Sequence, residues 1–240
     1  MDMLRVYPMK LACPDFHFVI NIPENRVPVL VLERSDLFHR TISLLLDQSE
    51  GIAGPFVLSD NWEPLDFEKR VVVITDLFHL ELNGRRQLAA LTRQLNTLAV
   101  SEKHIQATYA LQSDIVRWAL DLENDLPYAT IHNESVDVGA ILKATGIRFD
   151  DEMTDTAERL SNFIKICAAY LGTRLIVVNS LHSHMPEQSL QEIYKTAMYE
   201  KVSILDVERY IPDMKLPCEQ YYIIDRDNCE IYNNEDEDSL

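Results

Sequence analysis

Short, uniformly apolar runs in this sequence alternate with longer stretches in which apolar residues recur every three or four positions. Residues 71–74 are consecutive β-branched residues, too few for an amphipathic helix and too uniformly apolar for a half-exposed strand. They predict a strand that is buried on both faces in the middle of an α/β sheet. Residues 175–179 and 202–205 are two more such strands, and a helix opened by Pro186 lies between them. This strand-helix-strand order predicts parallel neighbours.

The same patterns predict further strands towards both ends of the chain. Ser35 is a good N-cap for a helix that ends before Gly51. Residues 225–228 are a polar, turn-like sequence between two apolar segments and predict a terminal hairpin. The other expected strands are residues 9–12, 17–22, 29–32, 56–58, 221–224 and 230–232.

The middle of the chain has an almost wholly helical pattern. A leucine seam with steps of three and four residues predicts a long helix over residues 85–100. Three more helices are expected: one ended by Pro127, one capped by Ser135 and closed by Gly146, and one from Thr154 to Gly172. The sequence therefore predicts a helical domain inserted into an α/β domain with a mixed, largely parallel sheet. The expected boundaries are 83–172 for the helical domain and 1–82 with 173–240 for the α/β domain, of which residues 233–240 are an acidic and disordered tail.

Composition restricts the possible partners. The chain has 22 Lys and Arg against 39 Asp and Glu, a net charge of −17. This argues against a protein that coats nucleic acid or an anionic membrane with its whole surface. No apolar run approaches the roughly 18 residues of a membrane helix, so a soluble, cytoplasmic protein without a membrane partner is expected. The 4 cysteines form no C-x-x-C pair, which argues against a disulfide framework or a zinc site built on them.

Residues that invite a catalytic interpretation lack the partners that catalysis needs. Asp76 follows an apolar strand, as a magnesium-binding acid does in nucleotide hydrolases, but the sequence contains no G-x-x-x-x-G-K-[ST] phosphate loop. Asp76 is therefore expected to be a turn or cap residue. His182 and His184 have no partner at the spacing of a known triad or metal motif, and a polar loop is expected there. These observations argue against ATP hydrolysis and against a catalytic triad or metal motif at these residues.

Charge is segregated within the predicted helical domain. Residues 83–117 contain five basic and two acidic residues, net +3, whereas residues 118–158 contain two basic and ten acidic residues, net −8. Two interpretations remain open. The stretches are either two solvated helical faces, or an anion site followed by a site for a hard cation such as calcium, because clustered carboxylates repel one another unless a cation joins them.

Eight short segments, in one order along nearly the whole chain from about residue 27 onward, resemble a known family. The order is similar to that of the ring-forming spacer-acquisition proteins of type II-A CRISPR systems. The segments are VLVLE at 29–33, FVLSD at 56–60, VVITDL at 72–77, LEND at 122–125, ILKATGI at 141–147, LIVVNS at 175–180, VSILDVE at 202–208 and QYYII at 220–224.

The resemblance implies a head that is a degenerate P-loop-ATPase-like α/β domain, and a helical leg. It also implies a homotetrameric ring around double-stranded DNA ends, without catalysis and without a bound nucleotide. The family supports insertion of new spacers together with the CRISPR integrase proteins and the type II effector nuclease. Calcium ions in the leg are a family property.

Candidate site residues follow from local charge and from the resemblance. The candidates for DNA binding, chosen by charge sign, are the basic set Arg85, Arg86, Arg93, Lys103 and Arg117. For calcium, Glu123 and Asp125 match the acidic stretch of the family, and Glu134 and Asp137 remain where relatives carry a denser acidic run; these four residues are the acidic set. Two alternatives stay open: an ATPase-like protein with an unrecognised phosphate loop, and an oligomeric scaffold that binds only proteins.

Overall fold

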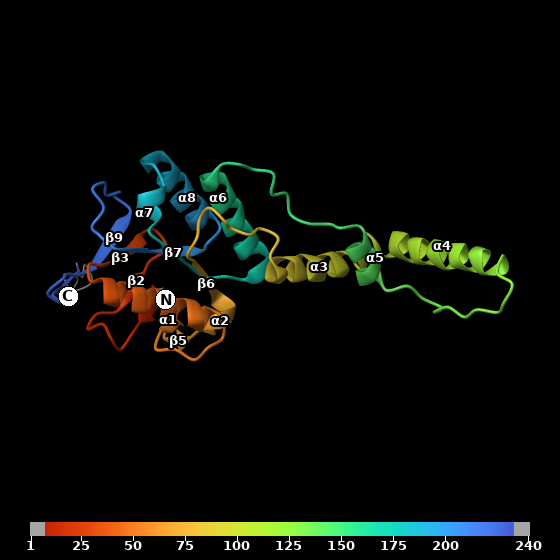
Figure 1. Ribbon diagram of the computed structural model, residues 1–240, viewed down its shortest axis with the longest axis horizontal. Helices are drawn as coiled ribbons and strands as arrows, with labels where there is room; N and C mark the ends of the chain where they lie inside the picture. Colours follow the sequence, from red (N-terminus) through yellow and green to blue (C-terminus); the bar gives the residue numbers. More distant parts are fainter. Residues whose placement is uncertain (1–7, 233–240) are drawn as a thin grey trace, which may run out of the picture. The chain divides into compact units, whose positions relative to one another are not determined.

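The computed structural model describes residues 8–232 and divides into two compact units (Figure 1). The first unit joins the chain up to Leu82 to the part from Glu152 onward, and the second unit is Asn83–Asp151. The expected boundary at residue 172 therefore lies about one helix too late, because α6 (Thr156–Ile166) packs along α8 (Glu187–Tyr199) in the first unit. The acidic tail expected at 233–240 lies outside the described residues.

A six-stranded sheet forms the centre of the first unit. Its strand order is β10-β9-β3-β8-β7-β6, and every neighbouring pair is parallel except β10 with β9. The predicted α/β class with a mixed, largely parallel sheet is confirmed, and so is the terminal hairpin. The strands are β3 (Val27–Leu32), β6 (Val71–Ile74), β7 (Leu175–Asn179), β8 (Ser203–Glu208), β9 (Glu219–Ile224) and β10 (Glu230–Tyr232).

The predicted central position of residues 71–74 is wrong. β6 is the last strand of the sheet, with β7 as its neighbour, and Val72 and Val73 are only half-buried. The central strands are β3, β8 and β7, and β3 starts two residues earlier than expected, with Pro28 inside it. Proline has no N–H to donate to a neighbouring strand. Pro28 is tolerated because the pairing of β3 with β8 begins only at the next residue, Val29.

A small antiparallel sheet packs with α1 against one face of the large sheet. Its order is β2-β1-β4-β5, and its strands are β1 (Met9–Ala12), β2 (Ile20–Ile22), β4 (Val57–Asp60) and β5 (Glu63–Pro64). Leu30, Leu205 and Tyr222 from the large sheet meet Leu11 and Leu45 in one continuous apolar core. This core stabilises the first unit by removing apolar side chains of both sheets and of α1 from water.

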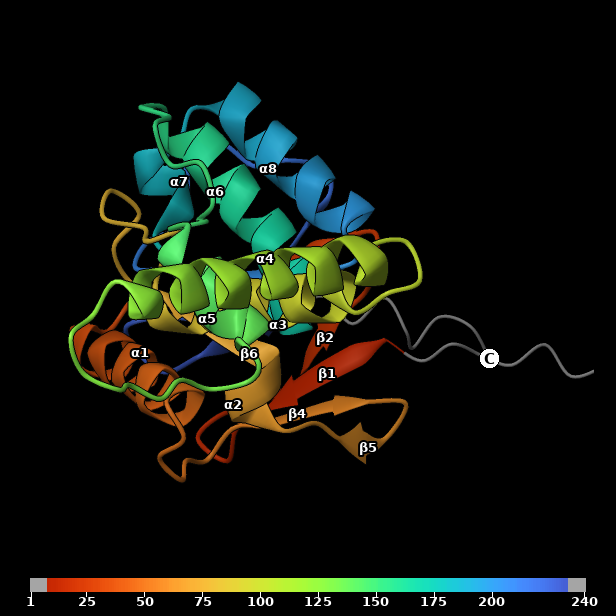
Figure 2. The ribbon, with the colours of Figure 1, turned by 90° about the vertical axis from the view of Figure 1, so that its right-hand side faces the viewer.

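Helices cover both faces of the large sheet. α6, α7 (Leu181–His184) and α8 lie on one side, and α1 (Ser35–Ser49) and α2 (Phe67–Arg70) on the other (Figure 2). α6 is capped by Asp155, whose side chain accepts from the N–H of Glu158, and not by the expected Thr154. α6 continues into a π-helical segment, η1 (Cys167–Leu171), which ends at Gly172 with a left-handed φ of 63°.

The second unit consists of α3 (Arg85–Ala99), α4 (Ile105–Asn124) and α5 (Val138–Ala144). Its two ends are tied together because the Asn83 side chain donates to the carbonyl of Phe149 and accepts from its N–H. Asp137, rather than the expected Ser135, caps α5 by accepting from the N–H of Ala140. Across both units, none of the helices in the described chain combines the length and the apolar character needed to cross a membrane.

The substitution Leu45→Ala should lower the free energy of unfolding by about 2 to 5 kcal/mol, because it leaves a cavity beneath α1 where Leu45 is fully buried. Ile52→Ala is the matched control, since Ile52 is 58% exposed, and should change stability by less than about 0.5 kcal/mol. Denaturant unfolding of both variants measures the difference. Equal losses would show that the apolar core does not hold α1.

Candidate functional site

The basic set lies entirely in the second unit. Arg85, Arg86 and Arg93 are exposed on α3, and Arg86 and Arg93 share a face two turns apart. Lys103 is exposed in the turn between α3 and α4. Arg117 is exposed on α4, where it pairs with Asp114 one turn away. The structure therefore places the five cations on consecutive segments of one unit, with three of them on a single helix.

The acidic set lies in the same unit but does not converge. Oε2 of Glu123 pairs with Nδ1 of His132 at 3.1 Å, and Asp137 is engaged as the cap of α5. Asp125 is at the C-terminus of α4, and Glu134 is exposed in the following loop. Across residues 8–232, no three donors of this set lie close enough together to share one metal ion. Carboxylate oxygens suit calcium, and calcium at these four residues stays a prediction.

Asp76 behaves as expected of a turn residue. Its Oδ1 accepts hydrogen bonds from the N–H groups of Phe78 and His79, at 2.9 Å and 3.2 Å. The connection from β3 to α1 consists of Glu33 and Arg34 alone, and the Arg34 side chain is occupied by Asp36 and Asn228. This connection is far shorter than a phosphate loop.

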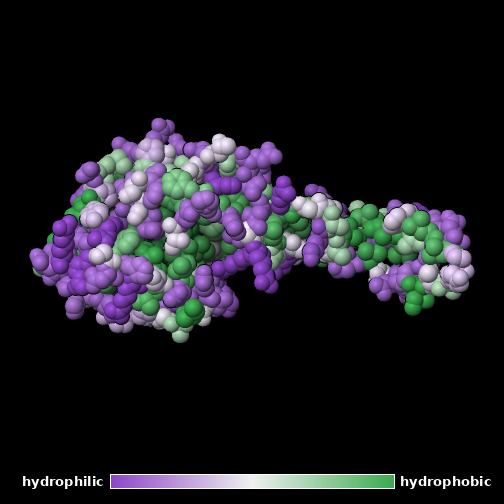
Figure 3. All heavy atoms as spheres, in the orientation of Figure 1, coloured by the Kyte–Doolittle hydropathy of each residue, from purple (hydrophilic) through white to green (hydrophobic). Residues whose placement is uncertain are grey.

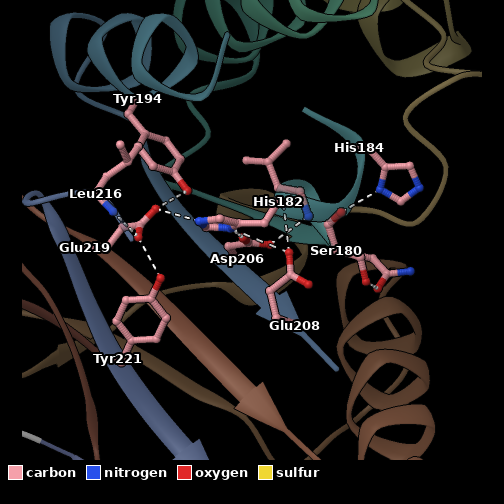
Figure 4. A network of polar contacts seen from close by, with 11 residues as sticks. Ser180, His182, His184, Tyr194, Asp206, Glu208, Leu216, Glu219 and Tyr221 are labelled. Carbon is pink, nitrogen blue, oxygen red and sulfur yellow. Dashed lines mark hydrogen bonds and ion pairs between the residues drawn. The ribbon is translucent and has the colours of Figure 1, made fainter. Parts of the chain in front are cut away.

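A buried polar cluster lies on the face of the large sheet that is opposite the apolar core. Asp206 and Glu208 alternate along β8 with Leu205 and Val207, so the two acids point away from the core that the two apolar residues enter. Glu219 begins β9, on the far side of β3 from β8. These three acids surround the side chain of His182 from α7 (Figure 4). The four residues are called the His182 cluster below.

The imidazole of His182 contacts all three carboxylates. Nδ1 lies 2.7 Å from Oδ2 of Asp206 and 3.6 Å from Oε1 of Glu208. Nε2 lies 2.9 Å from Oε1 of Glu219, but no hydrogen bond of good direction is formed there. The His182 side chain is 5% exposed, and those of Asp206 and Glu219 are fully buried. The contact with Glu219 is therefore a close but misaligned ion pair in a region shielded from solvent.

Backbone and phenol groups fix the carboxylates. Asp206 accepts from the N–H of Leu181, and Glu208 from the N–H of His182, at 3.0 Å and 2.8 Å. Glu219 accepts from the N–H of Leu216 at 2.8 Å. It also accepts from the hydroxyl groups of Tyr221 and Tyr194, at 2.7 Å and 3.3 Å. Each carboxylate thus has a defined orientation that does not depend on the imidazole of His182.

The cluster changes the pKa values of its members. Burial alone lowers the pKa of His182, but the attraction of the carboxylates of Asp206, Glu208 and Glu219 outweighs burial and raises the pKa to about 11. Burial raises the pKa of Asp206. Burial also opposes the charged form of Glu219, yet His182, Leu216 and Tyr221 together lower its pKa. Without another cation, the favoured state is an imidazolium held among the carboxylates.

The expectation of a polar loop at His182 is wrong, and the cluster was not predicted from the sequence. His182 is in a short helix and is buried, because Ser180 before it adopts a left-handed φ of 58° and turns the chain back over the sheet. One signal was present: Asp206 and Glu208 stand two positions apart beside buried apolar residues, which places both on one face of a strand. His182, Asp206 and Glu208 are also the one group in the described chain whose donor atoms lie close enough to share a metal ion.

The stability of the protein should depend on pH through His182. Because folding raises the pKa of His182, its contribution is fully present below pH 6.5 and is lost as the pH rises to about 11. Between these pH values the free energy of unfolding should fall more steeply with pH for the wild type than for His182→Gln. The difference between the two slopes should reach up to about 1.4 kcal/mol per pH unit. Denaturant unfolding with EDTA present measures both slopes. Equal slopes would mean that the folded state does not retain the proton on His182.

Comparisons with known proteins identify a family. No curated protein matches the chain. Among solved structures, a bacterial Atm1-family ABC exporter with ATP bound is 12% identical with a TM-score of 0.42, covering 94% of this chain and 39% of that chain. A putative ABC transporter ATP-binding protein from Pyrococcus furiosus is 7% identical with a TM-score of 0.37, covering 90% of this chain and 95% of that chain. The present chain spans well under half of the exporter, and neither likeness is close enough to carry an argument.

The family model described as "CRISPR-associated protein (Cas_Csn2)" matches residues 48–228, which include α3, α4, α5 and the whole His182 cluster. Because this match covers most of the 240 residues, the chain belongs to the Cas_Csn2 family of CRISPR-associated proteins.

Proposed function

We propose that the chain assembles into a homotetrameric ring that binds double-stranded DNA ends without sequence preference and has no catalytic activity. In this role it supports acquisition of new spacers, together with the CRISPR integrase proteins and the type II effector nuclease. Membership of the family supplies the link to CRISPR. The observation that carries the DNA-binding part is the basic set, concentrated in a protein of net charge −17.

The basic set suits the DNA backbone. Within the described residues no carboxylate lies within ion-pair distance of Arg85, Arg93 or Lys103, and all three side chains are exposed. Such cations bind phosphate by releasing counterions, which gives affinity without reading the base sequence. The acidic remainder of the surface limits non-specific binding elsewhere. A binding site confined to one part of the chain therefore agrees with the negative net charge.

The surface of α4 supports self-assembly. This 20-residue helix has no buried residue, although it carries large apolar side chains. Tyr109 and Trp118 are 62% and 63% exposed, and hydrophobic residues form green patches over this helix (Figure 3). An apolar helical surface of this kind is stable in water when another surface covers it. A second copy of the chain is the partner that a ring requires.

Simultaneous substitution of Arg85, Arg86 and Arg93 by Glu should reduce affinity for linear duplex DNA at least 100-fold, because it reverses three charges on one helix. The slope of log Kd against log salt should also fall, by roughly one unit for each phosphate that the variant no longer neutralises. Fluorescence anisotropy over a range of salt concentrations measures both quantities.

A matched control reverses three exposed lysines elsewhere: Lys143 on α5, Lys165 on α6 and Lys195 on α8. It makes the same change in net charge and should retain most of the affinity. An equal loss in both triple variants would mean that bulk charge, and not the basic set, governs binding. Unchanged affinity in the arginine variant would exclude α3 from the DNA site.

A ring that threads onto ends should discriminate between DNA topologies. We expect binding to linear duplex and at least 10-fold weaker binding to the same sequence as a relaxed closed circle, because a closed circle presents no end. Gel shift with both forms tests this, and sedimentation measures whether the mass is that of four chains. Equal binding to both forms would contradict threading. Binding to neither would favour the protein scaffold, and magnesium-dependent nucleotide binding in calorimetry would favour the ATPase-like alternative.

A further inference from the structure

We propose that His182, Asp206 and Glu208 bind one divalent transition-metal ion, for which Zn²⁺ is the best match, and that Glu219 orients the imidazole from behind. This site is in the first unit and is separate from both the basic set and the acidic set. It goes beyond the proposed function, which assigns no role to the α/β unit other than as part of the ring.

The donor atoms already stand at distances close to those of a metal site. All three lie within 4.8 Å of one another. Ligands at about 2.0 Å from a tetrahedral zinc ion are roughly 3.3 Å apart. The contacts of Nδ1 with Asp206 and with Glu208, 2.7 Å and 3.6 Å, fall on either side of this value. Movement of the three side chains towards a shared ion, with loss of the proton between Nδ1 and Asp206, creates the site.

The second nitrogen of the imidazole supports the same conclusion. When Nδ1 is a metal ligand, Nε2 carries the proton and needs a carboxylate or carbonyl acceptor. Glu219 is 2.9 Å from Nε2 and is held by Tyr221, Tyr194 and the N–H of Leu216, so the acceptor is in place. Nε2 is buried and has no well-directed hydrogen bond in the metal-free arrangement. A small rotation of the imidazole towards a metal ion on Nδ1 would give Nε2 a well-directed hydrogen bond to Glu219.

The net charge of the His182 cluster is an independent argument for a bound cation. The cluster buries three carboxylates around one imidazole, and within residues 8–232 no Lys or Arg nitrogen lies within 4 Å of any of them. Two basic side chains beside the cluster in sequence lie over aromatic rings: Lys215 lies over Tyr221, which donates to Glu219, and Arg209, which follows Glu208, lies over Tyr210. Excess buried negative charge is costly unless a cation balances it. A divalent ion with a neutral histidine balances the site better than one proton does.

The site is also accessible. A cavity of about 410 Å³ is lined by His182 and Glu208 together with residues 209–214. Three protein ligands leave one position of a tetrahedral zinc ion for a water molecule or a ligand atom. The cavity connects this fourth coordination position with solvent, whereas the side chains of Asp206 and Glu219 remain buried. Metal exchange therefore does not require unfolding of the sheet.

The test is titration of Zn²⁺ into the full-length protein after removal of metal ions with EDTA. Calorimetry should show one ion per chain, and saturating Zn²⁺ should raise Tm. Glu208→Gln and His182→Gln should each weaken Zn²⁺ binding at least 100-fold, because each removes a ligand. Glu219→Gln should weaken it about 10- to 100-fold, as expected when a group behind a metal-bound histidine is changed.

Controls separate loss of the site from loss of the fold. Glu134→Gln removes an exposed carboxylate of the acidic set and should leave Zn²⁺ affinity unchanged. Circular dichroism and the metal-free Tm show which variants fold, and Glu208→Gln, at the end of β8, preserves volume and is the decisive variant. The proposal is overturned if the wild type binds no Zn²⁺, or if folded Glu208→Gln binds it as tightly. It is also overturned if Glu208→Gln abolishes binding of Ca²⁺ while leaving that of Zn²⁺ intact.

Discussion

The register of β8 between β3 and β7 is the constraint on which the first unit depends. Asp206 is paired with Val29 of β3 and with Val178 of β7, so successive residues of β8 must point to opposite faces of the sheet. Leu205 and Val207 consequently enter the apolar core shared with α1 and the small sheet. The same alternation forces Asp206 and Glu208 onto the other face, where two buried charges must be satisfied. A shift of one residue would place both acids in the apolar core.

That requirement explains the arrangement of the elements on the polar face. The left-handed residue Ser180 turns the chain immediately after β7, and α7 presents both its first N–H groups and the imidazole of His182 to β8. Glu219 and its tyrosine partners close the cluster from the β9 side. The face that carries Asp206 and Glu208 is therefore held by directed bonds and charge as well as by apolar burial, since Ile176, Val178 and Ile204 are also buried on it. The opposite face is held by apolar burial. Substitutions in the His182 cluster should therefore alter protonation as well as stability, whereas those in the apolar core should alter mainly stability.

Local patterns predicted elements well but not their order in the sheet. The βαβ unit from β7 to β8 was predictable because apolar runs and a proline-opened helix determine it locally. The run at residues 71–74 has the same local pattern as a central strand, yet β6 is at the edge, since strand order depends on distant pairing. The His182 cluster was missed for the same reason: it joins residues from α7, β8 and β9 that only the sheet register brings together.

Net charge alone would have pointed away from nucleic acid, but binding of phosphate depends on local charge within about 10 Å. Within the second unit, the basic set precedes the acidic set along the chain, and α3 carries three arginines and no acidic residue. The three buried acids of the His182 cluster are part of the total of −17, and the proposed divalent ion would offset two of their three charges. With that ion bound, the protein would carry less negative charge than the sequence total, which is compatible with the proposed DNA binding.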